Sequence, residues 1–198
     1  MSKRKSKKYI LILLIIVVGI FVFFIPNLKK EEVKRKENKK VEEFIKKEDI
    51  TQELKQEEEV VKEDYIMILE IPKMNLKKGL YSMSSKYNNV SYNIQILKES
   101  SMPDEKNSNL ILAGHNGNSS VSFFDKLNKL EKEDKVYIYY NNYKYTYEIG
   151  NMYEVDKTGT IAIKKIKEEN AIVLISCKKY TKDKQLVYIG YLKEQEKY

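Results

Sequence analysis

Two side chains in this sequence have the chemistry of a nucleophilic active site: Cys177, the only cysteine, and His115, the only histidine. Cys177 ends the apolar run 171–177 (AIVLISC), and His115 lies in residues 110–116 (LILAGHN), just after another apolar run. Short apolar runs rich in Ile and Val and bounded by polar residues predict buried strands. Because a strand holds the residue at its tip in place, we expect both groups to be rigidly positioned. A thiol with an imidazole is the minimum set for thiolate catalysis.

The imidazole matters because an ordinary thiol is mostly protonated at neutral pH. A nearby imidazolium stabilises the thiolate and can later protonate a departing amine. One cysteine and one histidine do not by themselves establish catalysis, since a solitary cysteine is more often a small buried hydrophobic residue. A single cysteine cannot form a disulfide within the chain, and an unpaired cysteine in a secreted protein indicates a reactive thiol.

The charge of the chain does not indicate a nucleic-acid-binding protein. The formal net charge is +8, but the 37 basic and 29 acidic residues are mixed along most of the sequence. The strongest basic block, residues 3–8, precedes an apolar segment, as is typical of membrane topology signals. We therefore expect no nucleic-acid partner.

The apolar segment, residues 9–26 (YILILLIIVVGIFVFFIP), is uncharged and near the lower length limit for a membrane-spanning helix. A cleaved secretory signal is the alternative, but the apolar core is long and lacks a small-x-small cleavage site. We predict an uncleaved anchor, with residues 1–8 in the cytoplasm and the rest outside the cell. Residues 27–63 are densely charged, with sparse apolar positions at helical spacing. They predict a charged helical stalk, with a coiled-coil arm as the alternative.

Residues 64–198 have the sequence pattern of a β domain. Short β-type runs alternate with turn residues such as Pro72 and Gly79, and the 16 tyrosines without tryptophan suit a β-rich fold. The strands are predicted within residues 65–81, 93–97, 109–113, 135–140, 144–155, 171–177 and 185–192. Seven or eight such strands predict a β-barrel or a tight sandwich.

The connections between these strands carry their own signals. Ser122, followed three residues later by Asp125, predicts the start of a short helix that buries the apolar residues up to Leu130. Asn141 and Asn142 predict a hairpin between the fourth and fifth strands. Residues 156–170 are polar and are predicted to be mostly loop.

Several segments together resemble the sortase family, which consists of membrane-anchored cysteine transpeptidases of Gram-positive cell surfaces. They are LILAGHN (110–116), FFDKLNKLEKEDKVYIYYNNYKYTYEI (123–149), VLISC (173–177) and a last strand that closes the chain. Their order and spacing agree with the family over about residues 65–192. The resemblance implies a mainly β fold. It would be an eight-stranded β-barrel with one or two short helices, preceded by the transmembrane helix and the charged stalk.

The resemblance implies catalytic roles for particular positions. Cys177 matches the family nucleophile at the end of a TLxTC-like strand, with Ser176 where threonine is usual. His115 matches the family histidine, the general acid for the leaving amine. The third family residue is an arginine that opens the final strand and binds substrate carbonyls, but no arginine follows Arg35 in this chain.

Gln185 and Lys184 are the candidates for the arginine position. Successive strand residues face opposite ways, so only one of the two can point toward the thiolate. Gln185 could donate neutral hydrogen bonds, whereas Lys184 could supply charge but not the planar fork of arginine. The register of the apolar tail predicts Gln185.

The resemblance also implies an activity. Cys177 would cleave a C-terminal sorting motif of a surface protein, and an amine of a peptidoglycan precursor or pilin subunit would then resolve the thioacyl-enzyme. Residues 156–170 would form a wall of the substrate site. No cofactor is implied, and a calcium site of the kind found in some relatives has no assignable ligands.

The sequence also favours some family groups over others. It has no second apolar span near the C-terminus and no long insertion before Cys177, which favours the simpler groups, classes A, D and E. Two other functions are alternatives: a catalytically weak barrel that binds cell-wall peptides, and a hydrolytic cysteine protease.

Overall fold

The computed structural model describes residues 31–32, 34–46, 64–181 and 183–198. Residues 31–32 and 34–46 are helical, as the charged pattern predicts, and Glu32 and Lys36 form an i,i+4 ion pair of 2.9 Å. The predicted anchor, residues 9–26, lies outside the described residues. Within the described ranges, no helix combines the length and apolar character that crossing a bilayer requires.

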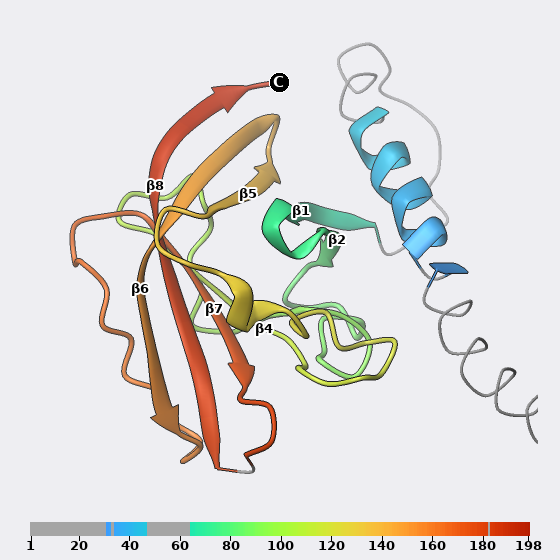
Figure 1. The fold of residues 1–198 in the computed structure, drawn as a ribbon. Coiled ribbons are helices and arrows are strands. Elements are labelled where there is room, and N and C mark those ends of the chain that lie inside the picture. Colours follow the sequence, from blue (N-terminus) through green and yellow to red (C-terminus); the bar gives the residue numbers. More distant parts are fainter. Residues whose placement is uncertain (1–30, 33, 47–63, 182) are drawn as a thin grey trace, which may run out of the picture. The chain divides into compact units, whose positions relative to one another are not determined.

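The described residues of the β domain contain eight strands in one sheet (Figure 1). They are β1 (Tyr65–Ile71), β2 (Leu76–Tyr81), β3 (Gln95–Ile96), β4 (Asn109–Ala113), β5 (Lys135–Tyr140), β6 (Tyr143–Asp156), β7 (Ala171–Cys177) and β8 (Lys184–Lys197). Their order is β2-β1-β5-β6-β8-β7-β4-β3. The β4–β7 pair is parallel and the other described pairs are antiparallel. The prediction of an eight-stranded, nearly closed barrel is confirmed.

Two buried asparagines complete the barrel where its edge strands, β2 and β3, approach each other. The Asn93 amide donates to the Gly79 carbonyl of β2 over 2.9 Å. Asn88 acts as a substitute strand for β3, since its side chain accepts from Ile96 N–H (2.7 Å) and donates to Ile96 C=O (2.9 Å). The open edge of β3 is thereby satisfied without a further strand.

The first hairpin corrects one detail of the sequence prediction. Gly79 lies inside β2 rather than in a connection. A Cβ at this position would come within 2.0 Å of the Tyr65 ring, so the glycine provides room for that ring. The turn is made instead by a 3-10 helix, η1 (Pro72–Met74), which ends at Asn75 in the left-handed conformation (φ 53°).

The helix predicted to start at Ser122 is wrong in type and position. The segment forms turns and one 3-10 helix, η2 (Leu127–Lys129). Ser122 Oγ bonds Ser119 Oγ (2.8 Å) instead of capping a helix, and Phe124 N–H donates to His115 C=O (2.9 Å) instead of to a helical partner. The predicted burial is confirmed for Phe124, Leu127 and Leu130.

The last predicted strand extends further than its apolar run. Asn141 and Asn142 both have positive φ (50° and 62°), as the tight turn between β5 and β6 requires. Beyond this turn, β8 continues to Lys197 and pairs with the start of β6. The added part is polar, and it includes a cross-strand ion pair between Lys144 and Glu196 (2.7 Å). Apolar alternation could not predict it, because neither face of this extension is buried.

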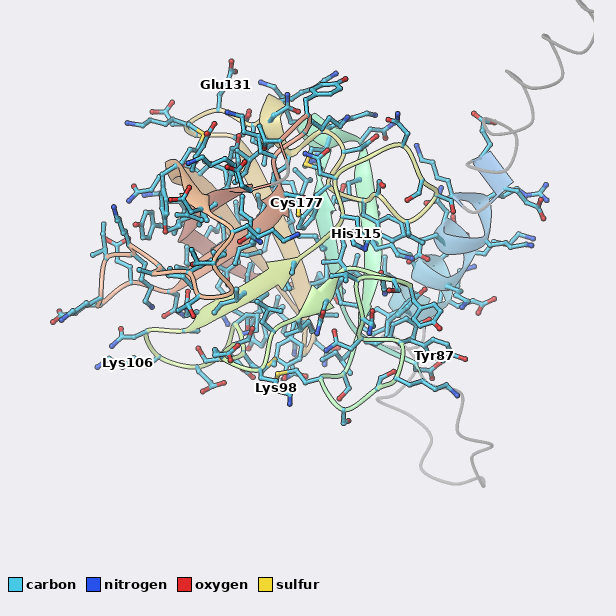
Figure 2. The ribbon with its side chains drawn as sticks, turned by 90° about the horizontal axis from the view of Figure 1, so that it is seen from below. Tyr87, Lys98, Lys106, His115, Glu131 and Cys177 are labelled. Carbon is cyan, nitrogen blue, oxygen red and sulfur yellow. The ribbon has the colours of Figure 1, made fainter. Side chains whose placement is uncertain are left out.

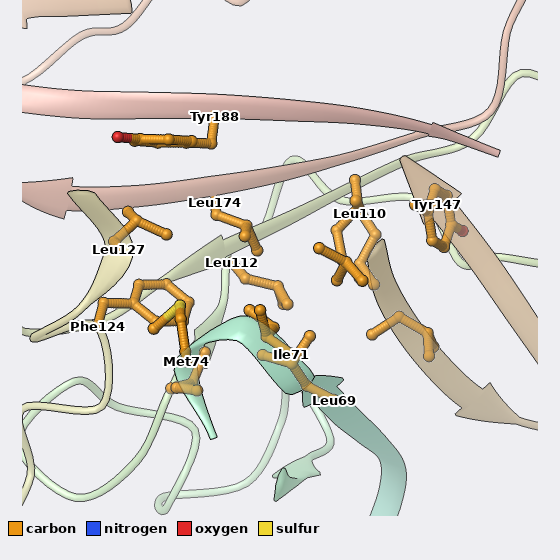
Figure 3. Close-up of a cluster of buried hydrophobic side chains, with 14 of the residues drawn as sticks. Leu69, Ile71, Met74, Leu110, Leu112, Phe124, Leu127, Tyr147, Leu174 and Tyr188 are labelled. Carbon is orange, nitrogen blue, oxygen red and sulfur yellow. The ribbon is translucent and has the colours of Figure 1, made fainter. Parts of the chain in front are cut away.

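The sheet buries side chains on both of its faces. The larger cluster fills the barrel and includes residues from β1, β4, β6, β7 and β8 (Figure 3). A second cluster covers the outer face of β4, β7 and β8, and we call it the outer cluster. Its buried members are Ile111, Ala171, Val173, Ile175, Val187, Ile189 and Tyr191. Residues 171–175 of β7 are therefore all apolar, because both of their faces are buried.

The Asn88 contact gives a test of how the barrel edge is held. In Asn88→Ala, both groups of Ile96 that Asn88 now binds lose their partner. We expect a loss of about 1–3 kcal/mol in the free energy of unfolding, measured by urea denaturation. Asn89→Ala is the control, because Asn89 is exposed and its side chain bonds only Ser91 N–H. Equal stability of the two variants would contradict the role assigned to Asn88.

Candidate active site

The direction of the Cys177 side chain follows from the alternation along β7. Ile172 and Leu174 belong to the barrel interior, whereas Val173 and Ile175 belong to the outer cluster. Cys177 continues the second series, so its thiol lies on the outer face of the sheet. The residue is half-buried, and a reagent can therefore reach it.

The parallel pairing of β4 with β7 brings His115 to the same end of the sheet. The register aligns Ala113 with Ile175, so the residues after β4 run beside the last residues of β7. Gly114 N–H continues the ladder to Ile175 C=O (3.1 Å). His115 is exposed and lies near Cys177 in the view from below (Figure 2). The structure thus puts the two residues that the sequence singled out at the same end of the β4–β7 pair.

Additional hydrogen bonds fix the loop that carries the imidazole. One comes from the serine before Cys177, one from the asparagine after the histidine, and one reaches the histidine carbonyl. They are Ser176 Oγ to Gly114 O (2.7 Å), Asn116 Nδ2 to Cys177 O (2.9 Å) and Phe124 N to His115 O (2.9 Å). These bonds tie Gly114 and Asn116 to β7, and they tie His115 to Phe124.

Gln185 lies directly opposite Cys177 on the neighbouring strand, β8. The adjacent main-chain bond runs from Lys178 N–H to Lys184 C=O (2.9 Å). Cys177 and Gln185 therefore form a non-hydrogen-bonded pair, the kind whose side chains approach most closely. Val187 and Ile189 continue the Gln185 series in the outer cluster, so Gln185 shares the face of the thiol.

Lys184 points to the opposite face and is engaged elsewhere. It pairs with Asp156 across β6 and β8, and the two side chains form an ion pair. The hydrogen bond to the Asp156 carboxylate raises the pKa of the Lys184 ammonium, which therefore stays charged. Of the two candidates for the arginine position, the register thus brings Gln185 and not Lys184 to the thiol.

The loop between β6 and β7, which was predicted as a wall of the substrate site, covers part of the outer face of the sheet. Ile161 and Ile163 pack against the outer cluster. The Tyr153 hydroxyl holds the loop by donating to Ala162 C=O (3.1 Å) and accepting from Lys164 N–H (3.1 Å). Apolar side chains of the loop therefore lie over the face that carries the thiol.

Lys165 fixes the far end of the same loop. Its ammonium donates to three main-chain carbonyls, those of Asn107 (2.9 Å), Ser108 (3.1 Å) and Glu169 (3.1 Å). Desolvation lowers the pKa of this ammonium. The loop is thus anchored to the connection that precedes β4, the strand that carries His115 at its end.

The described residues contain no cluster of three or more His, Cys, Asp or Glu side chains that could hold a metal ion.

Sequence reasoning missed two residues of this site. Ser176 was read only as a variation in the nucleophile motif, and Asn116 only as the end of LILAGHN. Both act on main-chain carbonyls of the partner segment, at Gly114 and Cys177. Their positions beside the thiol and the imidazole were the available signal, but the pairing of β4 with β7 was needed to interpret it.

The fold and the site define a β-barrel with a thiol and an imidazole at one end of a parallel strand pair. A model of the Sortase domain matches residues 69–193, which is more than half of the 198 residues. The chain belongs to the sortase family. A comparison with curated proteins gave no match.

Solved structures of sortases share the fold. Sortase A of Listeria monocytogenes is 21% identical with a TM-score of 0.57, covering 68% of this chain and 90% of its own. Sortase C1 of Streptococcus agalactiae is 26% identical with a TM-score of 0.58, covering 69% and 71%. Sortase E1 of Streptomyces coelicolor, solved with a tripeptide in the active site, is 21% identical with a TM-score of 0.55, covering 67% and 90%.

The packing at Gly114 gives a test of how the histidine loop is positioned. A Cβ on Gly114 would lie 2.8 Å from the Phe124 ring, so Gly114→Ala must displace Phe124. We expect a loss of about 1–3 kcal/mol in unfolding free energy, as for other overpacked sites. Phe124→Leu should relieve part of this loss, which a double-mutant cycle measures.

Gly117→Ala is the matched control in the same loop, because its Cβ would meet only Ser122 Oγ at 3.3 Å. If Gly114→Ala proves no more destabilising than Gly117→Ala, the loop is less constrained than the contacts indicate.

Proposed function

We propose that this protein is a membrane-anchored cysteine transpeptidase of the sortase type. The observation that carries the proposal is the parallel register of β4 and β7, which puts the residues after β4 at the end of β7 that carries Cys177. The Cys177 thiolate attacks the carbonyl carbon of a peptide bond within a C-terminal sorting motif. His115 protonates the departing amine, and the acyl part of the substrate remains on the thiol as a thioester.

A second amine completes the reaction. It attacks the thioester carbonyl, loses a proton to the imidazole, and releases the thiol as a new amide forms. The amine belongs to a peptidoglycan precursor or to a pilin subunit. The surface protein that carries the motif is thereby joined to the cell wall or to a pilus.

Gln185 takes the place of the family arginine in this mechanism. Its side-chain amide donates to the oxyanion that forms when Cys177 attacks, and to substrate carbonyls. The cross-strand pairing of Gln185 with Cys177 supports this role. A neutral amide stabilises the negative charge less than a guanidinium does, so acylation is expected to be slower than with arginine.

The cellular location follows from the sequence alone. Residues 9–26 anchor the chain in the membrane, residues 1–8 stay in the cytoplasm, and the catalytic domain, residues 64–198, faces outward. The charged residues 27–63 hold that domain away from the bilayer.

A second candidate function is a barrel that binds cell-wall peptides without turnover. The specific observation in its favour is that no arginine follows Arg35 in the chain. This function predicts peptide binding without a covalent adduct, so one assay separates the two.

The first prediction of this function concerns the proposed nucleophile, Cys177. The full chain in detergent is mixed with a panel of sorting-motif peptides and an amine, and mass spectrometry monitors Cys177. We expect a thioacyl adduct that Cys177→Ala abolishes without changing the melting temperature. His115→Ala should slow adduct formation by about a hundredfold or more.

Other outcomes of that assay have distinct meanings. No adduct with any peptide, together with measurable binding, favours the binding barrel. Product formation at a rate that does not depend on the amine concentration indicates a hydrolytic protease. Loss of folding in Cys177→Ala indicates a structural thiol.

The second prediction concerns Gln185. Gln185→Ala should slow acylation by about a hundredfold, because one oxyanion donor is lost. Lys184→Ala is the matched control and should change the rate little, because Lys184 faces away and pairs with Asp156. Gln185→Arg should acylate at least as fast as the natural protein. The reverse ranking of the two alanine variants in single-turnover kinetics would overturn the assignment.

A further inference from the structure

We propose that Asn116 is a positioning residue of the site: its side-chain amide binds the carbonyl of the nucleophile's own residue and so sets the separation of thiol and imidazole. The inference rests on the proposed function, because it assumes that His115 and Cys177 work as a pair. Neither the Gly-His motif nor the β4–β7 register by itself assigns a role to Asn116.

The first argument is the way the β4–β7 ladder ends. Gly114 N–H makes the last main-chain bond, to Ile175 C=O (3.1 Å). In a parallel ladder the next acceptor on β7 lies two residues further on, at Cys177 C=O. That carbonyl is bound by Asn116 Nδ2 at 2.9 Å. The Asn116 side-chain amide thus makes the bond to β7 that the next main-chain N–H would make if the ladder continued.

This substitution lets the chain turn away from the sheet at His115 without losing its attachment. His115 C=O is fixed separately by Phe124 N–H (2.9 Å). The main chain is therefore tied to its surroundings before, at and after the histidine, and the remaining freedom of the imidazole is rotation about its own side-chain bonds. Such restraint matters because a misplacement of about 1 Å can cost a hundredfold in rate.

The second argument is the orientation of the Asn116 amide. Its oxygen, Oδ1, is buried and accepts no hydrogen bond from the part of the chain that the structure describes. If the amide were flipped, this oxygen would face the Cys177 carbonyl oxygen and the two would repel each other. The donor end is therefore the end in use, and the side chain holds the carbonyl at the expense of its own acceptor.

The position also explains why aspartate, although isosteric, would be unsuitable. A carboxylate has no donor for the Cys177 carbonyl. It would also bring a negative charge close to the thiol, which disfavours the thiolate and raises its pKa. The neutral amide makes the contact without this penalty.

The test measures thiol titration and turnover separately in the full chain. Alkylation of Cys177 by iodoacetamide across a pH series gives the apparent thiol pKa, and peptide kinetics give kcat and KM. We expect Asn116→Ala to shift the pH profile of alkylation to higher pH than in the natural protein, because the loop that carries the imidazole is no longer held to Cys177. The same variant should lower kcat about tenfold or more with KM little changed.

Two further variants sharpen the result. Asn116→Asp should raise the midpoint more than Asn116→Ala does, because charge is added to the lost donor. Asn118→Ala is the matched control, an exposed asparagine of the same loop, and should leave both readouts unchanged. If Asn116→Ala does not fold, Asn116→Leu, which is close in volume and has no donor, is measured in its place with the same expectation.

The outcomes distinguish this inference from the proposed function. A lowered melting temperature with an unchanged alkylation profile and kcat makes Asn116 a purely structural cap and overturns the inference. A shifted alkylation profile in a protein that acylates none of the peptides supports the positioning role and contradicts the transpeptidase. A shifted alkylation profile together with a lower kcat supports both the positioning role of Asn116 and the transpeptidase activity.

Discussion

The parallel pairing of β4 with β7 is the constraint on which the site depends. Parallel strands end at the same edge of a sheet, so the residues that follow Ala113 emerge beside Cys177. Antiparallel pairing of the same two strands would separate the imidazole from the thiol by the length of the strands. A parallel pair also requires a long connection. His115 and Cys177 are therefore far apart in the sequence, because the residues between them form this connection.

The connection between the two strands serves the site as well as the topology. It contains the β5–β6 hairpin, which pairs with β8 on the far side of β7, and it returns through the loop that carries Ile161 and Ile163. Lys165 ties this loop to the carbonyls of Asn107 and Ser108, just before β4 begins. One segment thus builds the sheet, covers its outer face and attaches to the strand that delivers the imidazole.

Much of this arrangement could be predicted from the sequence, because local patterns carry it. The apolar runs of β4 and β7 and the two asparagines of the β5–β6 turn gave the correct elements. The predicted helix at Ser122 was wrong because a long-range bond from Phe124 to His115 replaces a helical one. The role of Asn116 was missed for a related reason. A side chain that substitutes for main chain in a ladder has no pattern in the sequence, and it can be recognised only when the neighbouring strand is known.

The place of β8 in the sheet has a consequence for how the molecule assembles. The last strand of the chain lies between β6 and β7 and pairs with both. During synthesis, which proceeds from the N-terminus, these two strands have no shared partner until β8 leaves the ribosome. Their apolar surfaces and open edges stay unprotected until then, as does the thiol at the end of β7. Completion of the barrel therefore depends on β8, and a chain that stopped before this strand would present the Cys177 thiol without its barrel.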